Sequence, residues 1–598
     1  MSPDLDNALR ERFGFPGFRP GQREACAAAL ADRDVLVVMP TGSGKSLCYQ
    51  LPGLMRDDLT VVVSPLVALM QDQVDALRAR GIGSLAAVVN AQRDAGENAS
   101  AVSAAVRGEL RLLYVAPERF AAPGFLDALG GAQVGLFVVD EAHCVSQWGH
   151  DFRPDYFRLA DAARALGARA IVASTATATP RVAADVVARL GLRDPLRVAT
   201  GFDRPNLAFA VARPAPHEKR RLVVEALRAD DALPAIVYAG TRAGSEDLAA
   251  MLTEALGEQA LPYHAGLDRD RRAAVQRRFL GDDVRLVVAT NAFGMGVDKP
   301  NVRTVLHASV PASLEAYYQE AGRAGRDGAP ARALLFAENR DKALHVHFIR
   351  SDEIGDGLPA KLGGLLAEAA DDGSLPGLSA ARYDVDAGEL ASELACDHDK
   401  LRSLIGHLSR AGVVMPSPAP GDRVTGRIVG EFDGRAEARC RASIAEAARV
   451  RWKQYREIWA YVEGSGCRRR TILRHFGDRA ESAARADCCD SRGAKLVPEL
   501  PPPDAASIES LDDAILSVAR TARPPVGRTT CAEILHGART KKIERNSYDG
   551  LPAYGTSADM RRTDILKRID ELIEARRLAT SGGPYPVLRA EPVPAQAA

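Results

Sequence analysis

Two short stretches of the chain carry residue types that could bind and hydrolyse a nucleoside triphosphate. The first, VVMPTGSGKS (37–46), follows a run of β-branched residues and precedes a helical pattern, which is the setting of a phosphate-binding loop. Glycines let backbone N–H groups curl around phosphates, Lys45 could reach the β- and γ-phosphates, and the Ser46 hydroxyl could bind Mg²⁺. Met39 occupies the place of the first glycine of the usual pattern. The predicted nucleotide-binding residues of this loop are Thr41, Gly42, Ser43, Gly44, Lys45 and Ser46.

The second stretch, LFVVDEAH (136–143), places Asp140 and Glu141 directly after an apolar run. Open α/β sheets bind ligands at the carboxyl ends of their strands. There Asp140 could hold Mg²⁺, and Glu141 could polarise the water that attacks the γ-phosphate. A solvated acidic turn is the alternative for these letters alone, but Lys45 upstream favours ATP hydrolysis.

The elements that must position these residues indicate an α/β fold. Two sets of short apolar runs, of the kind found in parallel sheets covered on both faces, divide the first 345 residues into two α/β units. Helical and winged-helix patterns follow. The predicted domains are 1–200 and 201–345 (two lobes), 346–434 (an inserted winged-helix-like segment), 435–495 (a helical hairpin), 496–505 (a Pro-rich linker), 506–592 (a winged helix) and 593–598 (a disordered tail).

Bulk composition limits the partners and the compartment. Lys+Arg and Asp+Glu both total 78, so any nucleic-acid surface must be local. Nine cysteines make a disulfide framework improbable in a chain with neither a signal-peptide pattern nor a membrane-spanning apolar run. The sequence therefore predicts a cytoplasmic protein with no membrane partner.

Many motifs in order resemble those of the RecQ-type DNA helicases of helicase superfamily two. This resemblance implies that the two α/β units are RecA-like lobes with parallel sheets. FGFPGFRPGQ (13–22) is similar to the family's adenine-recognition motif. By that resemblance Phe15 stacks on the base, Arg19 supports it and Gln22 binds its edge; ordinary core packing is the alternative for Phe15. SPLVALMQDQV (64–74) and APERF (116–120) resemble motifs that line the strand path, and STATAT (174–179) resembles motif III.

The second lobe carries a segment, YYQEAGRAGRDG (317–328), that resembles motif VI. The resemblance implies that Gln319 contacts the phosphates or their water, and that Arg323 and Arg326 meet the γ-phosphate, with Arg326 as the arginine finger. This lobe has no G-K-S/T loop. One lobe would therefore bind ATP and the other would supply arginines, so that closure depends on ATP.

An aromatic-rich segment follows the acidic pair. In the family the corresponding loop touches single-stranded DNA, which implies DNA-binding roles for Trp148, His150, Phe152 and Arg153. Such a loop would make hydrolysis depend on DNA. A hydrophobic plug between the lobes is the alternative.

The cysteines near residue 480 depart from the family's zinc pattern. GCRRRTILRHFGD (466–478) resembles the start of the zinc module, but Ala486 and Arg492 stand where the family's C-x-x-C-D-x-C has cysteines. Cys467, Cys488 and Cys489 could bind Zn²⁺, with His475 or Cys440 completing the set. Adjacent Cys488 and Cys489 are expected to be strained on one ion, which favours the alternative, a hairpin without metal.

The C-terminal segment resembles the RecQ winged helix. Lys541, Lys542 and Arg545 could contact duplex phosphates, with a solvated basic face as the alternative. Tyr585 would lie at the tip of a wing hairpin, where its ring could stack on an end base pair.

Together these features predict an ATP- and Mg²⁺-dependent DNA helicase that binds single-stranded and duplex DNA, and the resemblance implies 3′–5′ polarity. The resemblance implies a role in DNA repair and recombination, a nucleoid-associated location, and single-strand-binding or recombination proteins as candidate partners. A nucleic-acid-stimulated ATPase that does not unwind, and a DNA-binding scaffold that does not hydrolyse ATP, are the alternatives.

Overall fold

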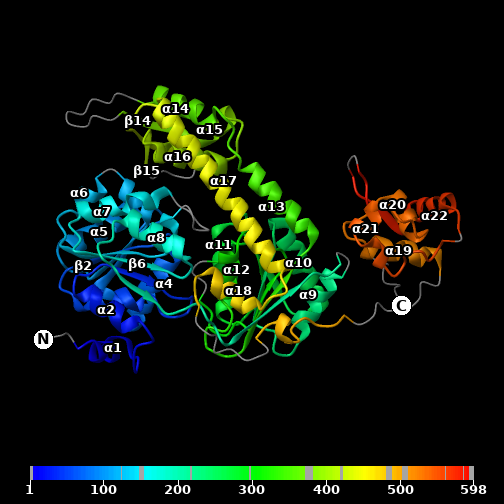
Figure 1. The fold of residues 1–598 in the computed structure, drawn as a ribbon, viewed down its shortest axis with the longest axis horizontal. Helices are drawn as coiled ribbons and strands as arrows, with labels where there is room; N and C mark the ends of the chain where they lie inside the picture. Colours follow the sequence, from blue (N-terminus) through cyan, green and yellow to red (C-terminus); the bar gives the residue numbers. More distant parts are fainter. Residues whose placement is uncertain are drawn as a thin grey trace.

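The computed structural model describes residues 4–122, 124–146, 154–215, 218–294, 298–370, 381–417, 422–479, 488–500, 510–558, 560–582 and 585–590. Two α/β lobes lie side by side, an inserted module sits above the first, and a small C-terminal module follows a linker (Figure 1). None of the helices in these ranges is both long enough and apolar enough to cross a membrane. The predicted α/β class with helical and winged-helix modules is confirmed.

Lobe 1 is built on a seven-stranded parallel sheet of order β3-β4-β2-β5-β6-β1-β7. Its central strands are buried on both faces, as their unbroken apolar runs predict. The strands are β1 Val35–Val38, β2 Leu59–Val63, β3 Ala86–Val89, β4 Leu112–Val115, β5 Val134–Val139, β6 Ala170–Thr175 and β7 Leu196–Ala199. The helices are α1 Leu5–Phe13, α2 Gln22–Leu30, α3 Leu47–Met55, α4 Val67–Ala79, α5 Ala95–Val106, α6 Phe125–Leu129, α7 Leu159–Ala165 and α8 Pro180–Leu190, with 3₁₀ turns η1 Gly83–Leu85, η2 Pro117–Ala121, η3 Ala142–Val145 and η4 Pro154–Arg158.

Lobe 2 repeats this plan with a six-stranded parallel sheet of order β10-β11-β9-β12-β13-β8. The strands are β8 Leu207–Ala212, β9 Ala235–Tyr238, β10 Ala260–Tyr263, β11 Leu286–Ala289, β12 Thr304–His307 and β13 Ala331–Phe336. The helices are α9 Lys219–Arg228, α10 Arg242–Leu256, α11 Arg269–Leu280, α12 Leu314–Ala321 and α13 Asn339–Ser351.

The inserted module has its own hydrophobic core and a three-stranded antiparallel sheet of order β14-β16-β15. The sequence predicts a winged-helix-like segment here, and that assignment stays a prediction. Its elements are α14 Leu358–Glu368, β14 Arg382–Asp386, α15 Ala387–Glu393, α16 His398–Ala411, β15 Val414–Ser417 and β16 Arg423–Ile428.

One long helix joins this module to lobe 2. Helix α17, Gly434–Glu463, has 30 residues and is therefore about 45 Å long. Its first half contributes Cys440 to the core of the inserted module. Its second half contributes Trp459 to the large hydrophobic core that also contains residues of both lobes. Figure 1 shows it running diagonally between the two, with α18, Arg468–His475, beyond its end.

The C-terminal module packs around a separate core. Its two short strands are antiparallel, and Tyr585 lies in the connection between them with 88% of its surface exposed. The elements are α19 Leu511–Thr521, α20 Arg528–Leu535, α21 Lys541–Arg545, η6 Tyr548–Gly550, α22 Arg562–Glu574, β17 Leu578–Thr580 and β18 Leu588–Ala590.

Candidate functional site

The phosphate-binding loop joins β1 to α3 in lobe 1. Gly42 and Gly44 have φ of 83° and 81°, the left-handed region that favours glycine. Ser46 immediately precedes α3, and its side chain makes no capping hydrogen bond to the helix. The backbone turns that a phosphate cradle requires are therefore present.

The adenine-motif residues hold this loop from outside. The Gln22 amide nitrogen donates to the carbonyls of Ser43 (3.0 Å) and Gly44 (3.1 Å), and its oxygen accepts from the Arg19 N–H (2.8 Å). The Arg19 guanidinium donates to the Gly42 carbonyl at 2.6 Å. Sequence reasoning did not anticipate this supporting role. Phe15 is 40% exposed, so its face is accessible, and its stacking on a base stays a prediction.

The acidic pair lies where β5 ends. Burial, and then the Glu141 carboxylate, raise the pKa of Asp140, while burial lowers the pKa of Lys45. A divalent cation beside Asp140 would favour its ionised form. Glu141 has φ of 47°, an uncommon conformation for a residue other than glycine, and such strain clusters at functional sites.

A buried histidine connects the acidic pair to motif III. His143 Nδ1 lies 3.3 Å from Glu141 Oε2 and 3.0 Å from Thr175 Oγ1 at the end of β6. Thr175 ends β6, and β6 leads into α8. Through His143, the orientation of the Glu141 carboxylate is therefore linked to the segment between β6 and α8.

Lobe 2 reaches the phosphate loop through motif VI. A Cβ placed on Gly42 would lie 3.3 Å from Arg326 Cγ, so the Arg326 side chain packs directly over the loop. Arg326 is ion-paired with Asp298 at 2.6 Å, and burial lowers its pKa. Within the described ranges, the Nε atoms of Arg323 and Arg326 are buried and have no hydrogen-bond partner. A buried donor without an acceptor is costly, and phosphate oxygens would supply acceptors. Gln319 lies on α12 in the same motif, and its phosphate contact stays a prediction.

A residue that the sequence reasoning missed bridges the two lobes. The Arg204 guanidinium donates to the carbonyls of Thr41 (3.3 Å) in the phosphate loop and Gly322 (3.2 Å) in motif VI. It also donates to the carbonyls of Ala324 (3.0 Å) and Gly325 (2.8 Å). Its position in GFDRPNL, between the lobes, was the only available signal.

The helical hairpin binds the same segment between the lobes. Arg469 donates to Asp203 Oδ1 (2.5 Å) and to the Arg204 carbonyl (2.7 Å). Phe202 stacks on Phe476 with 4.4 Å between ring centroids. The hairpin is thus attached to the segment that joins the two lobes.

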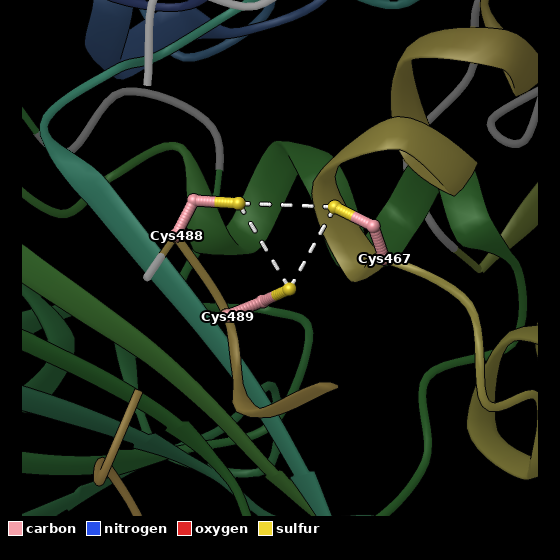
Figure 2. Close-up of side chains that lie close together, drawn as sticks. All are labelled: Cys467, Cys488 and Cys489. Carbon is pink, nitrogen blue, oxygen red and sulfur yellow. Dashed lines mark hydrogen bonds between the residues drawn. The ribbon is translucent and has the colours of Figure 1, made fainter. Parts of the chain in front are cut away.

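The three cysteines converge at the edge of the lobe 2 sheet (Figure 2). The Sγ atom of Cys467 lies 3.7 Å from those of Cys488 and Cys489, which are 3.9 Å apart. Tetrahedral zinc with Zn–S bonds of about 2.3 Å gives S–S distances of about 3.8 Å. The three sulfur atoms therefore fit three corners of a zinc site, and the adjacency of Cys488 and Cys489 does not keep their sulfurs apart.

The proposed completing ligands lie elsewhere. Cys440 belongs to the core of the inserted module, and His475 Nε2 is paired with Glu315 Oε1 at 2.8 Å. Neither completes the triangle, and among the described residues the cluster holds no fourth nitrogen or sulfur ligand.

Four family models match successive parts of the chain: DEAD/DEAH box helicase (residues 19–186), helicase conserved C-terminal domain (218–328), RecQ zinc-binding (434–491) and RQC domain (508–596). The ATP-dependent DNA helicase RecQ of Bacillus subtilis is 31% identical over 97% of this chain and 81% of its own length. The chain belongs to the RecQ family of ATP-dependent DNA helicases. The probable helicase RecS of B. subtilis is 39% identical over 59% of this RecQ-family chain and 71% of its own length. The RecQ of Haemophilus influenzae is 42% identical over 57% of this chain, which spans 54% of that relative.

Because the RecQ zinc-binding model matches this part of the chain, the metal content of the cysteine cluster should be measured. We expect about one zinc ion per purified chain. The variant Cys467→Ser should lose this ion, and its melting temperature should fall by at least about 5 °C, because a structural zinc ion stabilises only the folded hairpin. Atomic emission spectroscopy and thermal unfolding measure both. Cys396→Ser, outside the cluster, is the matched control. Metal-free wild-type protein would contradict the prediction.

The residues predicted to bind single-stranded DNA follow the acidic pair in the sequence. Trp148, His150, Phe152 and Arg153 lie outside the described residues. The turn that follows them is tied to the acidic pair, because the Tyr156 hydroxyl donates to the Asp140 carbonyl at 3.1 Å.

The predicted duplex-binding residues lie on the C-terminal module. Lys541, Lys542 and Arg545 are exposed on α21, although Lys542 Nζ also donates to Thr530 Oγ1 at 2.7 Å. Their contact with DNA stays a prediction, as does that of Tyr585.

Proposed function

We propose that this chain hydrolyses ATP between its two lobes and uses the cycle to move 3′ to 5′ along single-stranded DNA and unwind duplexes. The observation that carries the proposal is the packing of Arg326 over Gly42, because it brings an arginine of one lobe to the phosphate loop of the other. DNA repair and recombination are the proposed setting, with duplex DNA as the substrate and single-strand-binding or recombination proteins as partners.

The proposed hydrolysis divides its tasks between the lobes. Phe15 and Gln22 contact the base, and Lys45 and the amides of the phosphate loop hold the phosphates. Ser46 and Asp140 would hold Mg²⁺, which neutralises phosphate charge. Glu141 orients the attacking water and accepts its proton as the bond between the β- and γ-phosphates breaks.

Charge that develops on the γ-phosphate is met from lobe 2. Arg326 and Arg323 stabilise it, and Gln319 contacts the phosphates or the water. When phosphate leaves, these arginines lose their acceptors and the lobes can separate. Arg204 keeps the phosphate loop and motif VI in register through four backbone carbonyls.

The remaining modules are proposed to manage DNA. The segment that holds Trp148, His150, Phe152 and Arg153 binds the tracking strand, while the winged helix at 506–592 holds the duplex through Lys541 and Lys542 and places Tyr585 against the end base pair. Zn²⁺ bound by Cys467, Cys488 and Cys489 would keep the hairpin at 435–495 closed against the edge of lobe 2.

Strand displacement tests this function. With ATP and Mg²⁺, we expect a 3′-tailed duplex to be unwound and a 5′-tailed duplex to remain intact, and Lys45→Ala to abolish the reaction. Unwinding of 5′-tailed duplexes alone would overturn the polarity. ATP hydrolysis stimulated by DNA without displacement would overturn the helicase function and indicate a remodelling ATPase.

A further inference from the structure

The inserted module has the helix and strand order of a winged helix, and the middle of its third helix, α16, is covered by neighbouring helices. Residues 404–408 of α16 are buried without interruption, because α14 and α17 pack against this helix. His407 Nδ1 lies 2.9 Å from Ser443 Oγ of α17. A different surface of the module carries arginine side chains without partners among the described residues.

That surface is one face of its sheet. Arg382 of β14 lies directly opposite Arg427 of β16, so the two side chains share a face. The same face carries Arg423, whose charge is paired with Asp384 at 2.7 Å. Within the described chain, the side chains of Arg382 and Arg427 make no hydrogen bond or ion pair. Two like charges directly opposite each other destabilise a strand pair, so this face holds uncompensated positive charge.

Lobe 1 adds another arginine near Arg427, on the side of the sheet where β15 contacts lobe 1. The module is seated on lobe 1 where β15 packs against η2, and η2 lies against η4. Arg158, the last residue of η4, is half-buried and has no hydrogen-bond or ion-pair partner in the described ranges. Burial, followed by the charge of Arg427, lowers the pKa of Arg158; Asp155 and Asp161 act in the opposite direction without forming an ion pair with it.

A tyrosine beside this arginine also has an unused polar atom. Tyr383 is 1% exposed, and within the described residues its hydroxyl has no hydrogen-bond partner. Burial raises the pKa of Tyr383, and the nearby positive charge of Arg158 opposes that shift. The strand register directs the Tyr383 side chain to the face opposite Arg382 and Arg427, into the core of the module, so the positive charge of the seam between lobe 1 and the module comes from the arginines alone.

We propose that Arg158, Arg382 and Arg427 form a phosphate-binding seam in which the inserted module is the outer wall of the single-stranded DNA path over lobe 1. A phosphodiester backbone is the fitting occupant, because its evenly spaced charges can pair with guanidinium groups from three chain segments at once. The inference rests on the proposed function, since η4 directly follows the segment predicted to bind single-stranded DNA and η2 belongs to the APERF motif.

Binding of single-stranded DNA at increasing salt concentrations tests the seam. For Arg382→Ala/Arg427→Ala we expect about tenfold weaker binding of a fluorescent oligothymidine at low salt, and a slope of log affinity against log salt that is shallower by about 1.4, because about 0.7 is lost per phosphate contact. Arg423→Ala is the matched control, because its charge lies on the same face but is already paired with Asp384. The variant Arg382→Lys/Arg427→Lys should preserve the slope.

A second measurement separates this inference from the proposed function. The alanine double variant should keep the wild-type turnover number for ATP hydrolysis at saturating DNA and should need more DNA to reach half of it. If wild-type protein shows no hydrolysis stimulated by DNA, the proposed function fails while the binding test still applies. A double variant that is folded and has wild-type affinity and salt slope would overturn the seam, and would leave an acidic protein partner as the occupant to consider.

Discussion

Replacing Arg326 by alanine is expected to lower the turnover number of ATP hydrolysis about 10³-fold or more, with a much smaller change in KM for ATP. The side chain packs over Gly42 from the opposite lobe, and its buried Nε has no acceptor among the described residues. An arginine placed in this way interacts most strongly when charge develops on the γ-phosphate, so its loss should affect the transition state more than binding. Phosphate release at saturating DNA and ATP measures the effect.

Two variants make this result specific. Arg285→Ala removes an exposed arginine of the same lobe that is ion-paired with Glu258, and should leave turnover within about twofold, as surface ion pairs contribute little. Arg326→Lys should recover only a small part of the activity, because an ammonium group cannot reproduce the planar donor fork. Turnover of Arg326→Ala within about tenfold of wild type would remove Arg326 from the role of arginine finger.

Local signals explain why much of the nucleotide site could be predicted. The phosphate loop depends on glycines at left-handed positions and on a strand-to-helix setting, which are all encoded within ten residues. The acidic pair could also be predicted from local sequence, because it directly follows the apolar run of a buried strand. The unbroken apolar runs of both lobes predicted parallel sheets, because such strands are covered on both faces.

Contacts between distant segments could not be predicted in this way. Arg204 binds the carbonyl of Gly322, 118 positions later in the chain, and a backbone carbonyl leaves no signature in residue type. The supporting role of Gln22 is hidden for the same reason. Adjacency in sequence was expected to strain Cys488 and Cys489 on one ion, but it does not separate their sulfurs: Cys489 pairs in parallel with Phe209 and its Sγ still lies near that of Cys488.

The inserted module shows a further limit of pattern reading. Its helix and strand order was recognisable, but the burial of α16 depends on α17 and α14, which are not part of the local pattern. A sequence pattern can therefore identify a winged-helix-like topology and still not tell which of its surfaces is accessible.

Replacing Glu141 by glutamine is expected to lower the turnover number about 10²- to 10⁴-fold, the range that a positioned general base contributes, while ATP affinity stays near that of wild type. Glutamine keeps the shape of the side chain but loses its negative charge and its ability to accept a proton. Asp140→Asn should differ, because it removes a proposed Mg²⁺ ligand and should weaken ATP binding as well. Equilibrium binding of a fluorescent ATP analogue, measured beside phosphate release, separates the two variants.

The surroundings of Glu141 decide how this result is understood. Its carboxylate is held near His143, which also contacts Thr175, so Glu141→Gln tests the proton acceptor while the link to motif III can persist. Glu97→Gln, an exposed residue of α5, is the control for a loss of one negative charge on the same lobe. Because the variant retains ATP, it should hold the lobes closed and bind single-stranded DNA more tightly with ATP than wild-type protein does under turnover. If Glu141→Gln hydrolyses ATP at the wild-type rate, another group must accept the proton, and the strained backbone at Glu141 would then need a different explanation.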